Sequence, residues 1–287
     1  MNLISKTVGF IGVGYMGYGI AKNFLKHNFI LNVIAHKNRV PIEKLIKLGA
    51  NEVSTYDDLA KNINCLIICV TNTIIAKEIA NKIVSKLKAG TLFIDITTHH
   101  KNGSVEMEDI LSKNKIKYIE CPVMGGPVQA EEGVLGGIIG ASDNNYKEAK
   151  EYLETFCKNT FHFGSVGVAA KTKLISNFLS LGTATFVIET IKAANHFNID
   201  LEKLYNVSKL GSGNSGALKR IAEKAVNGDY KGYIFTVNNS FKDLSYINEM
   251  LKDLPNAEKL SSLAKSFYKE AINKGKGELL ISELIEK

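Results

Sequence analysis

Two polar side chains near the start of a long apolar stretch have the types and spacing for proton transfer. Lys173 and Asn177 are four residues apart, so in a helix they share one face. Burial and the positive end of a helix both disfavour a charged ammonium, which lowers the lysine pKa toward a value suited to proton transfer. Asn177 could orient a substrate oxygen. Spacing alone leaves open a simpler interpretation, in which Lys173 extends its ammonium to solvent.

A glycine pattern near the start of the chain has the spacing that phosphate binding requires. An apolar strand leads into Gly12, Gly14 and Gly17, and an amphipathic segment follows. The first glycine permits a tight turn, the second leaves room for a pyrophosphate, and the third lets the helix pack close to the strand. The helix then presents free N–H groups to the phosphates. The order strand, glycine turn, helix predicts a dinucleotide site that includes Tyr15 and Met16.

A basic segment follows the second apolar strand. It contains His36, Lys37 and Arg39, where sites for NAD usually have an acidic residue that binds the ribose 2′-hydroxyl. Cations attract a 2′-phosphate, whereas a carboxylate would repel it. The segment therefore favours NADPH over NADH, with a solvated basic turn as the alternative.

The elements that position these residues alternate along the first half of the chain. Helical patterns such as residues 41–48 and 79–87 separate the apolar runs VGFIGV, ILNVIA, NCLIICV, GTLFIDI and IKYIECPV. Alternating strands and helices predict βαβ units, that is, an N-terminal Rossmann domain of the α/β class with a doubly wound parallel sheet. A further strand pair is expected at residues 136–140 and 160–163.

The pattern changes after residue 164. Residues 169–195 are nearly all small or apolar, so we expect a long interdomain helix that is buried around most of its circumference. Beyond it, glycine-rich turns separate further helices. We therefore predict a nucleotide-binding domain at 1–164 and an all-α domain at 165–287. The active site is expected in the crevice between them, outside the carboxyl ends of the strands.

The composition is that of a globular protein, with 45% hydrophobic and 23% charged residues among 287. The net charge is +7, but the lysines are spread along the chain. We therefore expect an acidic small-molecule substrate and no nucleic acid. No apolar run approaches the ~20 residues of a membrane helix, so no membrane partner is expected. The first residues lack the apolar core of a signal peptide, which predicts a cytoplasmic protein.

The cysteines form no metal-binding pattern. Cys65, Cys69, Cys121 and Cys157 contain no CxxC pair, and the first two lie in an apolar strand-like run. Buried thiols are expected, with a metal site or disulfide as the alternative. No metal is predicted.

Four longer motifs, two of which contain the glycine turn and the Lys173 and Asn177 pair described above, occur in order along the chain, together with DITT at residues 95–98. They are GFIGVGYMGYGIAKN at 9–23, ECPVMGGPVQAEEGVLGG at 120–137, GSVGVAAKTKLISN at 164–177 and FKDL at 241–244. Through them the chain, from residue 8 to about residue 284, resembles the β-hydroxyacid dehydrogenases, the group of 3-hydroxyisobutyrate dehydrogenase and tartronate semialdehyde reductase. The resemblance implies hydride transfer between a nicotinamide and the carbon that bears a hydroxyl or carbonyl oxygen.

The same resemblance implies roles for individual residues. Lys173 would be the general acid in reduction and the general base in oxidation, with Asn177 as its partner. Gly125 and Gly126 would offer backbone N–H groups to a substrate carboxylate, while Lys242 and Asp243 would lie near the nicotinamide and the substrate. The implied cofactor residues are Gly12, Gly14, Tyr15, Met16, Gly17, His36, Lys37, Arg39, Val70, Thr71, Thr97 and Lys242. The implied substrate residues are Thr98, Met124, Gly125, Gly126, Lys173, Asn177 and Asp243.

The chain departs from the family pattern at the substrate loop. Met124 stands where the family has a serine, and a thioether cannot donate a hydrogen bond to a carboxylate. The family's Asp-Ala is Glu120-Cys121 here, and its Asn-Arg-Thr after the second strand falls on residues 35–37. Met124 suggests a more apolar or larger substrate end. The expected substrate is a small semialdehyde acid, such as succinic, methylmalonic or tartronate semialdehyde.

Two other functions have a similar sequence pattern. An imine reductase would share the fold, and Met124 fits a less acidic substrate, but those relatives typically lack the lysine. A non-catalytic nucleotide-binding relative would also lack it. Lys173 therefore argues against both. The apolar C-terminal helices and the resemblance predict a homodimer or homotetramer in which each helical domain covers another's surface.

Overall fold

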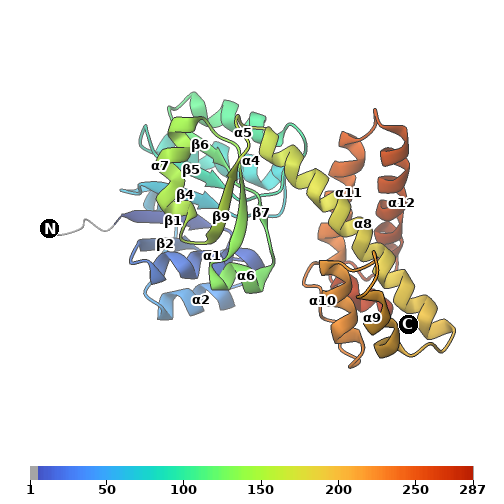
Figure 1. Ribbon diagram of the computed structural model, residues 1–287. Coiled ribbons are helices and arrows are strands. Elements are labelled where there is room, and N and C mark those ends of the chain that lie inside the picture. Colours follow the sequence, from blue (N-terminus) through green and yellow to red (C-terminus); the bar gives the residue numbers. More distant parts are fainter. Residues whose placement is uncertain (1–5, 287) are drawn as a thin grey trace. The chain divides into compact units, whose positions relative to one another are not determined.

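The computed structural model describes residues 6–286. The chain divides into two compact units, residues 1–173 and 174–287. Figure 1 shows the α/β unit in blue to green and the helical unit in yellow to red. The predicted boundary at residue 164 precedes the long helix, whereas the compact units divide after Lys173 because the first turns of that helix pack with the α/β unit.

The α/β unit contains a six-stranded parallel sheet in the order β3-β2-β1-β4-β5-β6. The predicted doubly wound sheet is confirmed. Strand order reverses between β1 and β4, and ligands of such sheets bind outside the carboxyl ends of the strands at this point. The strands are β1 Thr7–Ile11, β2 Ile30–Ile34, β3 Asn51–Val53, β4 Cys65–Ile68, β5 Leu92–Asp95 and β6 Lys117–Glu120.

Helices cover both faces of this sheet (Figure 1). Neighbouring residues of a strand enter opposite cores, with Ile67 packing toward α1, α2 and α7 and Leu66 toward α3, α4 and α5. This burial on both sides explains the continuous apolar strand sequences. The helices are α1 Tyr15–Lys26, α2 Val40–Lys47, α3 Tyr56–Ala60, α4 Thr73–Ile83 with η1 Val84–Lys86, α5 Gly103–Ser112 and α7 Asp143–Leu153.

A second, three-stranded sheet completes the α/β unit. β8 (Leu135–Ile139) pairs antiparallel with β7 (Val123–Met124) and parallel with β9 (Cys157–His162). β8 and β9 confirm the strand pair predicted from the sequence. Between β7 and β8 lies α6 (Pro127–Glu132), which packs against α1. This arrangement puts the loop that resembles a substrate loop beside the glycine-turn helix.

The helical unit is built on the long helix α8 (Val168–His196), close to the predicted span of 169–195. Buried faces of α8, α10, α11 and α12 form its apolar core, with Tyr268 fully buried. The later helices are α9 Leu201–Ser208, α10 Gly216–Ala225, α11 Val237–Met250, α12 Pro255–Asn273 and η2 Ile281–Ile285. As predicted, turns that contain glycines separate α9 from α10, α10 from α11 and α12 from η2, whereas the turn between α11 and α12 (residues 251–254) has none.

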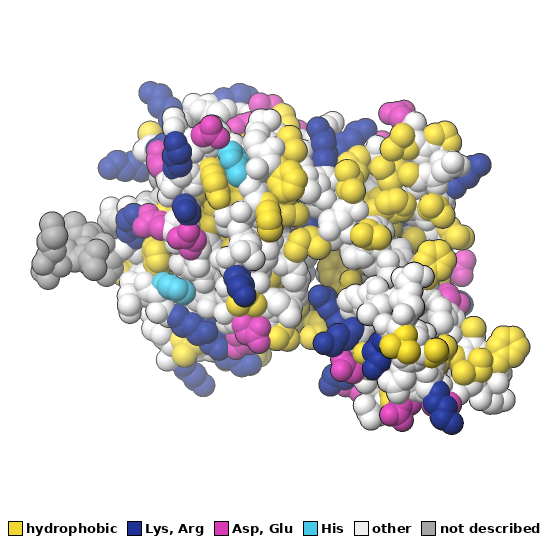
Figure 2. Space-filling view, in the orientation of Figure 1, with side chains coloured by type: hydrophobic (Ala, Val, Ile, Leu, Met, Phe, Trp, Pro, Cys, Tyr) yellow, Lys and Arg dark blue, Asp and Glu magenta, His cyan; other side chains and the backbone are white. Residues whose placement is uncertain are grey.

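The prediction that the long helix is buried around most of its circumference is wrong. Only 39% of its most apolar 18-residue window is buried, and Ile175, Leu179 and Phe186 are 58%, 73% and 68% exposed. Figure 2 shows hydrophobic side chains, in yellow, gathered on the face of the helical unit that is turned toward the viewer. The helix is also long and apolar enough to cross a membrane by composition, contrary to expectation, although core helices of soluble proteins pass the same test.

Candidate active site

The glycine turn has the geometry of a phosphate-binding turn. Gly12 has φ +98°, and a Cβ there would lie 2.1 Å from the Cys69 carbonyl oxygen. A Cβ on Gly17 would lie 2.0 Å from the Gly12 oxygen, so any larger residue would force α1 away from β1. A Cβ on Gly14 would meet no atom within 4 Å. The open side of the turn therefore lies where a pyrophosphate would approach the N-terminus of α1.

A buried asparagine fixes α1 against α6. Asn23 is 2% exposed, and its Nδ2 donates to the carbonyl oxygens of Gly19 (2.9 Å) and Ala130 (2.8 Å). A Cβ on Gly19 would lie 2.5 Å from the Glu131 backbone nitrogen. The two helix backbones therefore touch here. Asn23 ends the motif at residues 9–23, but no role was predicted for it. A polar asparagine on an apolar helix face could have indicated a buried hydrogen bond.

The basic segment after β2 is exposed, and one of its cations is already paired. Arg39 makes a bidentate contact with Glu52, at 3.0 and 3.1 Å, and its Nε lies 3.6 Å from Glu43. Glu52 raises the pKa of the Arg39 guanidinium further above its usual value. His36 and Lys37 are also exposed. The charge of Arg39 is thus balanced by the Glu52 carboxylate on β3, which distinguishes Arg39 from its two basic neighbours.

Two of the predicted cofactor residues meet at the carboxyl ends of β4 and β5. The Val70 backbone N–H donates to the Thr97 hydroxyl (3.3 Å), and the Thr97 N–H donates to Asp95 Oδ1 (2.9 Å). Thr97 is 2% exposed, whereas Thr98 is half-buried and Thr71 is exposed. The hydroxyl of Thr97 is therefore part of the loop's own hydrogen bonding.

Sequence reasoning missed the buried network that holds this loop. His99 Nε2 lies 2.7 Å from Asp95 Oδ2, which also accepts from the Tyr118 hydroxyl (3.1 Å). The other ring nitrogen of His99 lies 3.1 Å from the Thr73 hydroxyl at the start of α4. Burial and the Asp95 carboxylate raise the pKa of Tyr118 well above its usual value, so it remains a donor. An Asp and a His four residues apart just after a strand was a signal in the sequence.

In the loop that resembles the family's substrate loop, one backbone N–H already makes a hydrogen bond within the loop. Gly125 has φ +118° and is exposed. The Gly126 N–H, which the resemblance assigned to a substrate carboxylate, donates to Gln129 Oε1 at 2.9 Å. The Gln129 side chain would have to move before Gly126 could bind a carboxylate.

Lys173 reaches back to the same loop. Its ammonium donates to the Val123 carbonyl oxygen (2.8 Å) and lies 3.5 Å from Met124 Sδ. Lys173 is half-buried. The structure therefore brings the predicted general acid and the unusual Met124 into direct contact, and Lys173 does not extend into bulk solvent.

Three predicted site residues meet within the helical unit. Asn177, on α8, donates through Nδ2 to Asp243 Oδ2 on α11 at 2.7 Å. Lys242 Nζ forms an ion pair with Asp243 Oδ1 at 2.8 Å. Asp243 is 1% exposed. Its carboxylate thus fixes Asn177 and balances Lys242.

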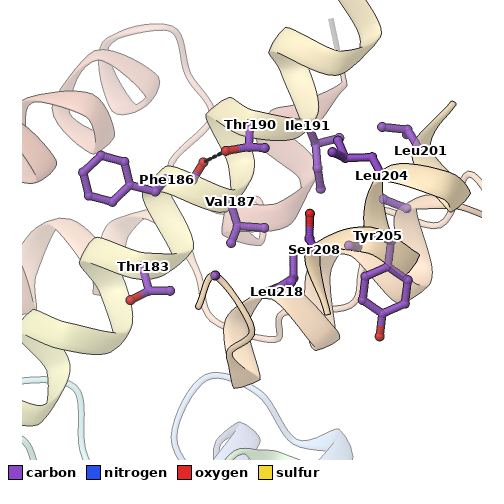
Figure 3. A pocket seen from close by; sticks show the side chains of 13 residues that line it. Thr183, Phe186, Val187, Thr190, Ile191, Leu201, Leu204, Tyr205, Ser208 and Leu218 are labelled. Carbon is purple, nitrogen blue, oxygen red and sulfur yellow. Dashed lines mark hydrogen bonds between the residues drawn. The ribbon is translucent and has the colours of Figure 1, made fainter. Parts of the chain in front are cut away.

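An apolar cavity of about 250 Å³ lies in the helical unit between α8, α9 and α10. Figure 3 shows Val187, Leu204 and Leu218 around it, with the Phe186 ring pointing away. None of the predicted site residues lines this cavity.

The cysteines are free thiols, and three of the four are buried as expected. Cys69 is half-buried, and burial of its thiol raises the pKa to about 12. No cluster of potential metal ligands occurs within residues 6–286.

Two family models match the chain. Residues 7–164 match the NAD binding domain of 6-phosphogluconate dehydrogenase, and residues 167–287 match a model for NAD-binding of NADP-dependent 3-hydroxyisobutyrate dehydrogenase. The chain belongs to the β-hydroxyacid dehydrogenase family. It is an NAD(P)-dependent oxidoreductase that acts on CH–OH groups.

Similar proteins share this organisation along the whole chain. This β-hydroxyacid dehydrogenase is 28% identical, over 96% of its length, to the probable mitochondrial 3-hydroxyisobutyrate dehydrogenase of Dictyostelium discoideum, of which it covers 88%. The structure of 3-hydroxyisobutyrate dehydrogenase from Salmonella typhimurium superposes with a TM-score of 0.90 at 24% identity, covering 98% of this chain and 99% of that one.

An imine reductase from Myxococcus stipitatus in complex with NADP⁺ has a lower TM-score of 0.66 at 19% identity, over 97% of this chain and 98% of that one. The fold is thus shared with the imine reductases, but the likeness to the hydroxyacid dehydrogenase is greater.

Proposed function

We propose that this protein uses NADPH to reduce the semialdehyde of a small carboxylic acid to the hydroxy acid, and that it also catalyses the reverse reaction. The contact of the Lys173 ammonium with the Val123 carbonyl oxygen and Met124 Sδ supports this proposal most directly. The ammonium lies beside the loop that resembles the family's substrate loop, where a proton donor would be needed. Imine reductases that lack this lysine would use a different donor.

When bound, NADPH supplies the hydride, and the protein must supply the proton. As the carbonyl carbon gains the hydride, negative charge develops on its oxygen, and a nearby ammonium stabilises that charge and transfers a proton. In the oxidative direction the neutral amine of Lys173 takes the hydroxyl proton. The Val123 carbonyl oxygen orients the ammonium, so little reorganisation is needed at the moment of transfer.

Asn177 orients a substrate oxygen from the same helix face as Lys173. Its Nδ2 is fixed by Asp243, which leaves its amide oxygen in a defined direction. Asp243 itself is buried beside Lys242. A carboxylate would repel an acidic substrate, so Asp243 acts through Asn177 and Lys242.

The residues of the glycine turn fit the cofactor's pyrophosphate, because the space beside Gly14 is open. Toward a 2′-phosphate, His36 and Lys37 are the principal basic side chains, because Arg39 is shared with Glu52. Within the α/β unit, Val70, Thr71 and Thr97 would hold the nicotinamide half. Replacing His36 and Lys37 by alanine should lower the ratio of NADPH to NADH efficiency (kcat/KM) about tenfold or more, which corresponds to the loss of ~1.4 kcal/mol of charge-assisted binding. An unchanged ratio would contradict the assignment.

Met124 sets the substrate class in this proposal. A thioether next to Lys173 gives the site a less polar wall than the family's serine, which favours a semialdehyde acid with an apolar or longer carbon chain. Replacing Met124 with serine should shift preference toward smaller, more polar substrates such as tartronate semialdehyde.

The experiment that tests the function measures oxidation of NADPH and NADH by absorbance against semialdehyde acids, glyoxylates and cyclic imines. Turnover of a semialdehyde acid with NADPH is the expected result. Turnover of imines alone, or cofactor binding with no turnover, would overturn the proposal.

We also propose that two copies associate through an apolar row on α8. Ile175, Leu179, Gly182 and Phe186 follow a spacing of three to four residues, and a Cβ on Gly182 would meet no atom within 4 Å. Residues 174–188 contain no charged side chain. An uncharged row with a glycine at its centre suits close contact with the same row of a second copy. Four free thiols support a reducing compartment, and we propose the cytoplasm.

A further inference from the structure

The first turn of α8 takes its hydrogen-bond acceptor from a distant strand. The four N–H groups at the start of a helix have no partner within it. Gly167, just before α8, has no side chain that could cap the helix, and the first turn contains no acidic residue. The carboxylate of Glu120, at the end of β6, accepts from the Gly167 N–H at 2.8 Å and from the Ala170 N–H.

Three donors from residues 6–286 hydrogen-bond to this carboxylate. Besides the two backbone groups, the Ser104 hydroxyl on α5 donates to Oε1 at 2.6 Å. An ionised carboxylate has only acceptor sites, whereas a protonated carboxyl group carries a donor of its own. Three donors around Glu120 therefore favour the ionised form. Glu120 is nevertheless fully buried, and burial raises the pKa of its carboxyl group despite these hydrogen bonds.

The same short segment holds α8 at a second point. Three residues after Glu120, the Val123 carbonyl oxygen accepts from the Lys173 ammonium at 2.8 Å. Lys173 in turn lies three residues after Ala170, which is about one helical turn. Residues 120–123 therefore contact both the backbone of the first turn of α8 and the functional side chain of the next turn.

The geometry points to Glu120 as a positioning residue that sets the rotation and depth of α8 and so aims the Lys173 ammonium. This inference rests on the proposed role of Lys173. A further feature supports it: a Cβ on Gly140 would lie 2.4 Å from Glu120 Oε2. The glutamate, longer than the family's aspartate by one methylene, thus occupies space that a glycine leaves open.

Glu120→Gln and Gly140→Ala test the inference in different ways. The first replaces one acceptor oxygen with a donor group that faces other donors, and the second displaces the carboxylate without removing it. Each should lower kcat about 10²-fold, the effect of moving a reacting group by roughly 1 Å. The Kd for NADPH, measured by nucleotide fluorescence, should stay within about twofold because the glycine turn is untouched.

Two variants serve as controls. Ser104→Ala keeps the carboxylate and both of its bonds to α8, so kcat should stay close to that of the native protein. Glu120→Asp keeps the charge on a shorter side chain and should restore part of the activity that Glu120→Gln loses. With NADPH deuterated at the transferred position, the isotope effect on kcat should rise in Glu120→Gln, because the chemical step becomes slower.

The outcomes separate this inference from the proposed function. If Lys173→Ala keeps normal turnover, the proposed function fails. If Lys173→Ala loses turnover while the Glu120 and Gly140 variants keep kcat, only the positioning role fails. A parallel loss of kcat, NADPH binding and melting temperature in all of the Glu120 and Gly140 variants would assign Glu120 a structural role and overturn the inference. If Glu120→Gln does not fold, Glu120→Asp and Gly140→Ala still decide between these results.

Discussion

The first turns of α8 and the turns that follow them differ in what they contact. Up to Lys173 the helix is held by polar atoms of its own α/β unit, with the Glu120 carboxylate on its backbone and the Val123 carbonyl on Lys173. From Ile175 to Phe186 it presents exposed apolar side chains. One helix thus combines a stretch fixed by polar contacts with a stretch that the proposed association would cover. The apolar composition of α8 therefore does not determine how much of the helix is buried within the chain.

The largest expected effect tests the polar stretch. Lys173→Ala should lower kcat by at least ~10²-fold, because the developing alkoxide loses its proton donor, while the melting temperature changes little. Steady-state kinetics with NADPH and the best semialdehyde measure the loss. Lys171→Ala is the matched control, because Lys171 is exposed two residues earlier on the same helix. Near-normal turnover of Lys173→Ala, or an equal loss in both variants, would remove the distinction between the two stretches.

A charge in the exposed row tests the apolar stretch. Phe186→Glu should weaken self-association by about 10²-fold or more, because an unpaired carboxylate would be buried against the partner's apolar row. Analytical ultracentrifugation across a concentration series measures this change. Asn195→Glu adds the same charge at an exposed position of α8 outside the row and should leave association unchanged. A native protein that stays monomeric at all concentrations would refute the proposed interface.

Asn177 lies within the apolar stretch, but its side chain is buried and contacts Asp243 on α11 of the same helical unit. Asn177→Ala removes a hydrogen bond to a buried carboxylate, so the free energy of unfolding should fall by ~1–3 kcal/mol. Turnover should fall less than in Lys173→Ala. Denaturant unfolding and kinetics on the same samples measure both quantities, and Ser180→Ala, on a half-buried residue of the same helix, is the control. A change in turnover without any change in stability would mean that Asp243 does not hold Asn177 in solution.

The sequence predicted the features of the site that depend on neighbouring residues. The glycine turn follows from local backbone demands, and the alternation of strands and helices follows from apolar periodicity. Their spacing on one helix drew attention to Lys173 and Asn177, and the family resemblance then implied their roles. Glu120 was noted only as a departure from the family pattern, because its partners Gly167 and Ala170 are 47 and 50 residues away. The Asp95–His99 network was missed because Tyr118 and Thr73 reach it only in the folded sheet.

The exposure of α8 could not be read from the sequence for a different reason. A helix that is apolar on all sides gives the same pattern whether its own chain or a second copy covers it. The engagement of the Gly126 N–H by Gln129 was equally hidden, because the motif named the glycines and not the side chain that reaches them. Burial and hydrogen-bond occupancy are tertiary properties, and they decide which residues of a motif remain available to a ligand.

The smallest effect concerns how the polar stretch responds to pH. Burial raises the pKa of the Glu120 carboxyl in the folded protein, so the stabilising contribution of this group is fully present below its unfolded pKa of about 4.3 and is lost as pH rises through the folded value. Glu120→Gln cannot ionise. Its free energy of unfolding relative to the native protein should therefore increase as pH rises from about 4.3 through the folded pKa, by ~1.4 kcal/mol for each unit of the pKa rise.

Urea unfolding of both proteins at several pH values measures this difference, and Ser104→Ala, which keeps the carboxyl group, should follow the native curve more closely. A relative stability that falls with pH would mean that the α8 backbone and Ser104 stabilise the carboxylate by more than its burial costs. Glu120 would then be a stabilising cap as well as a positioning residue. The polar and apolar stretches of α8 would differ in what covers them, but both would contribute to the stability of the assembled protein.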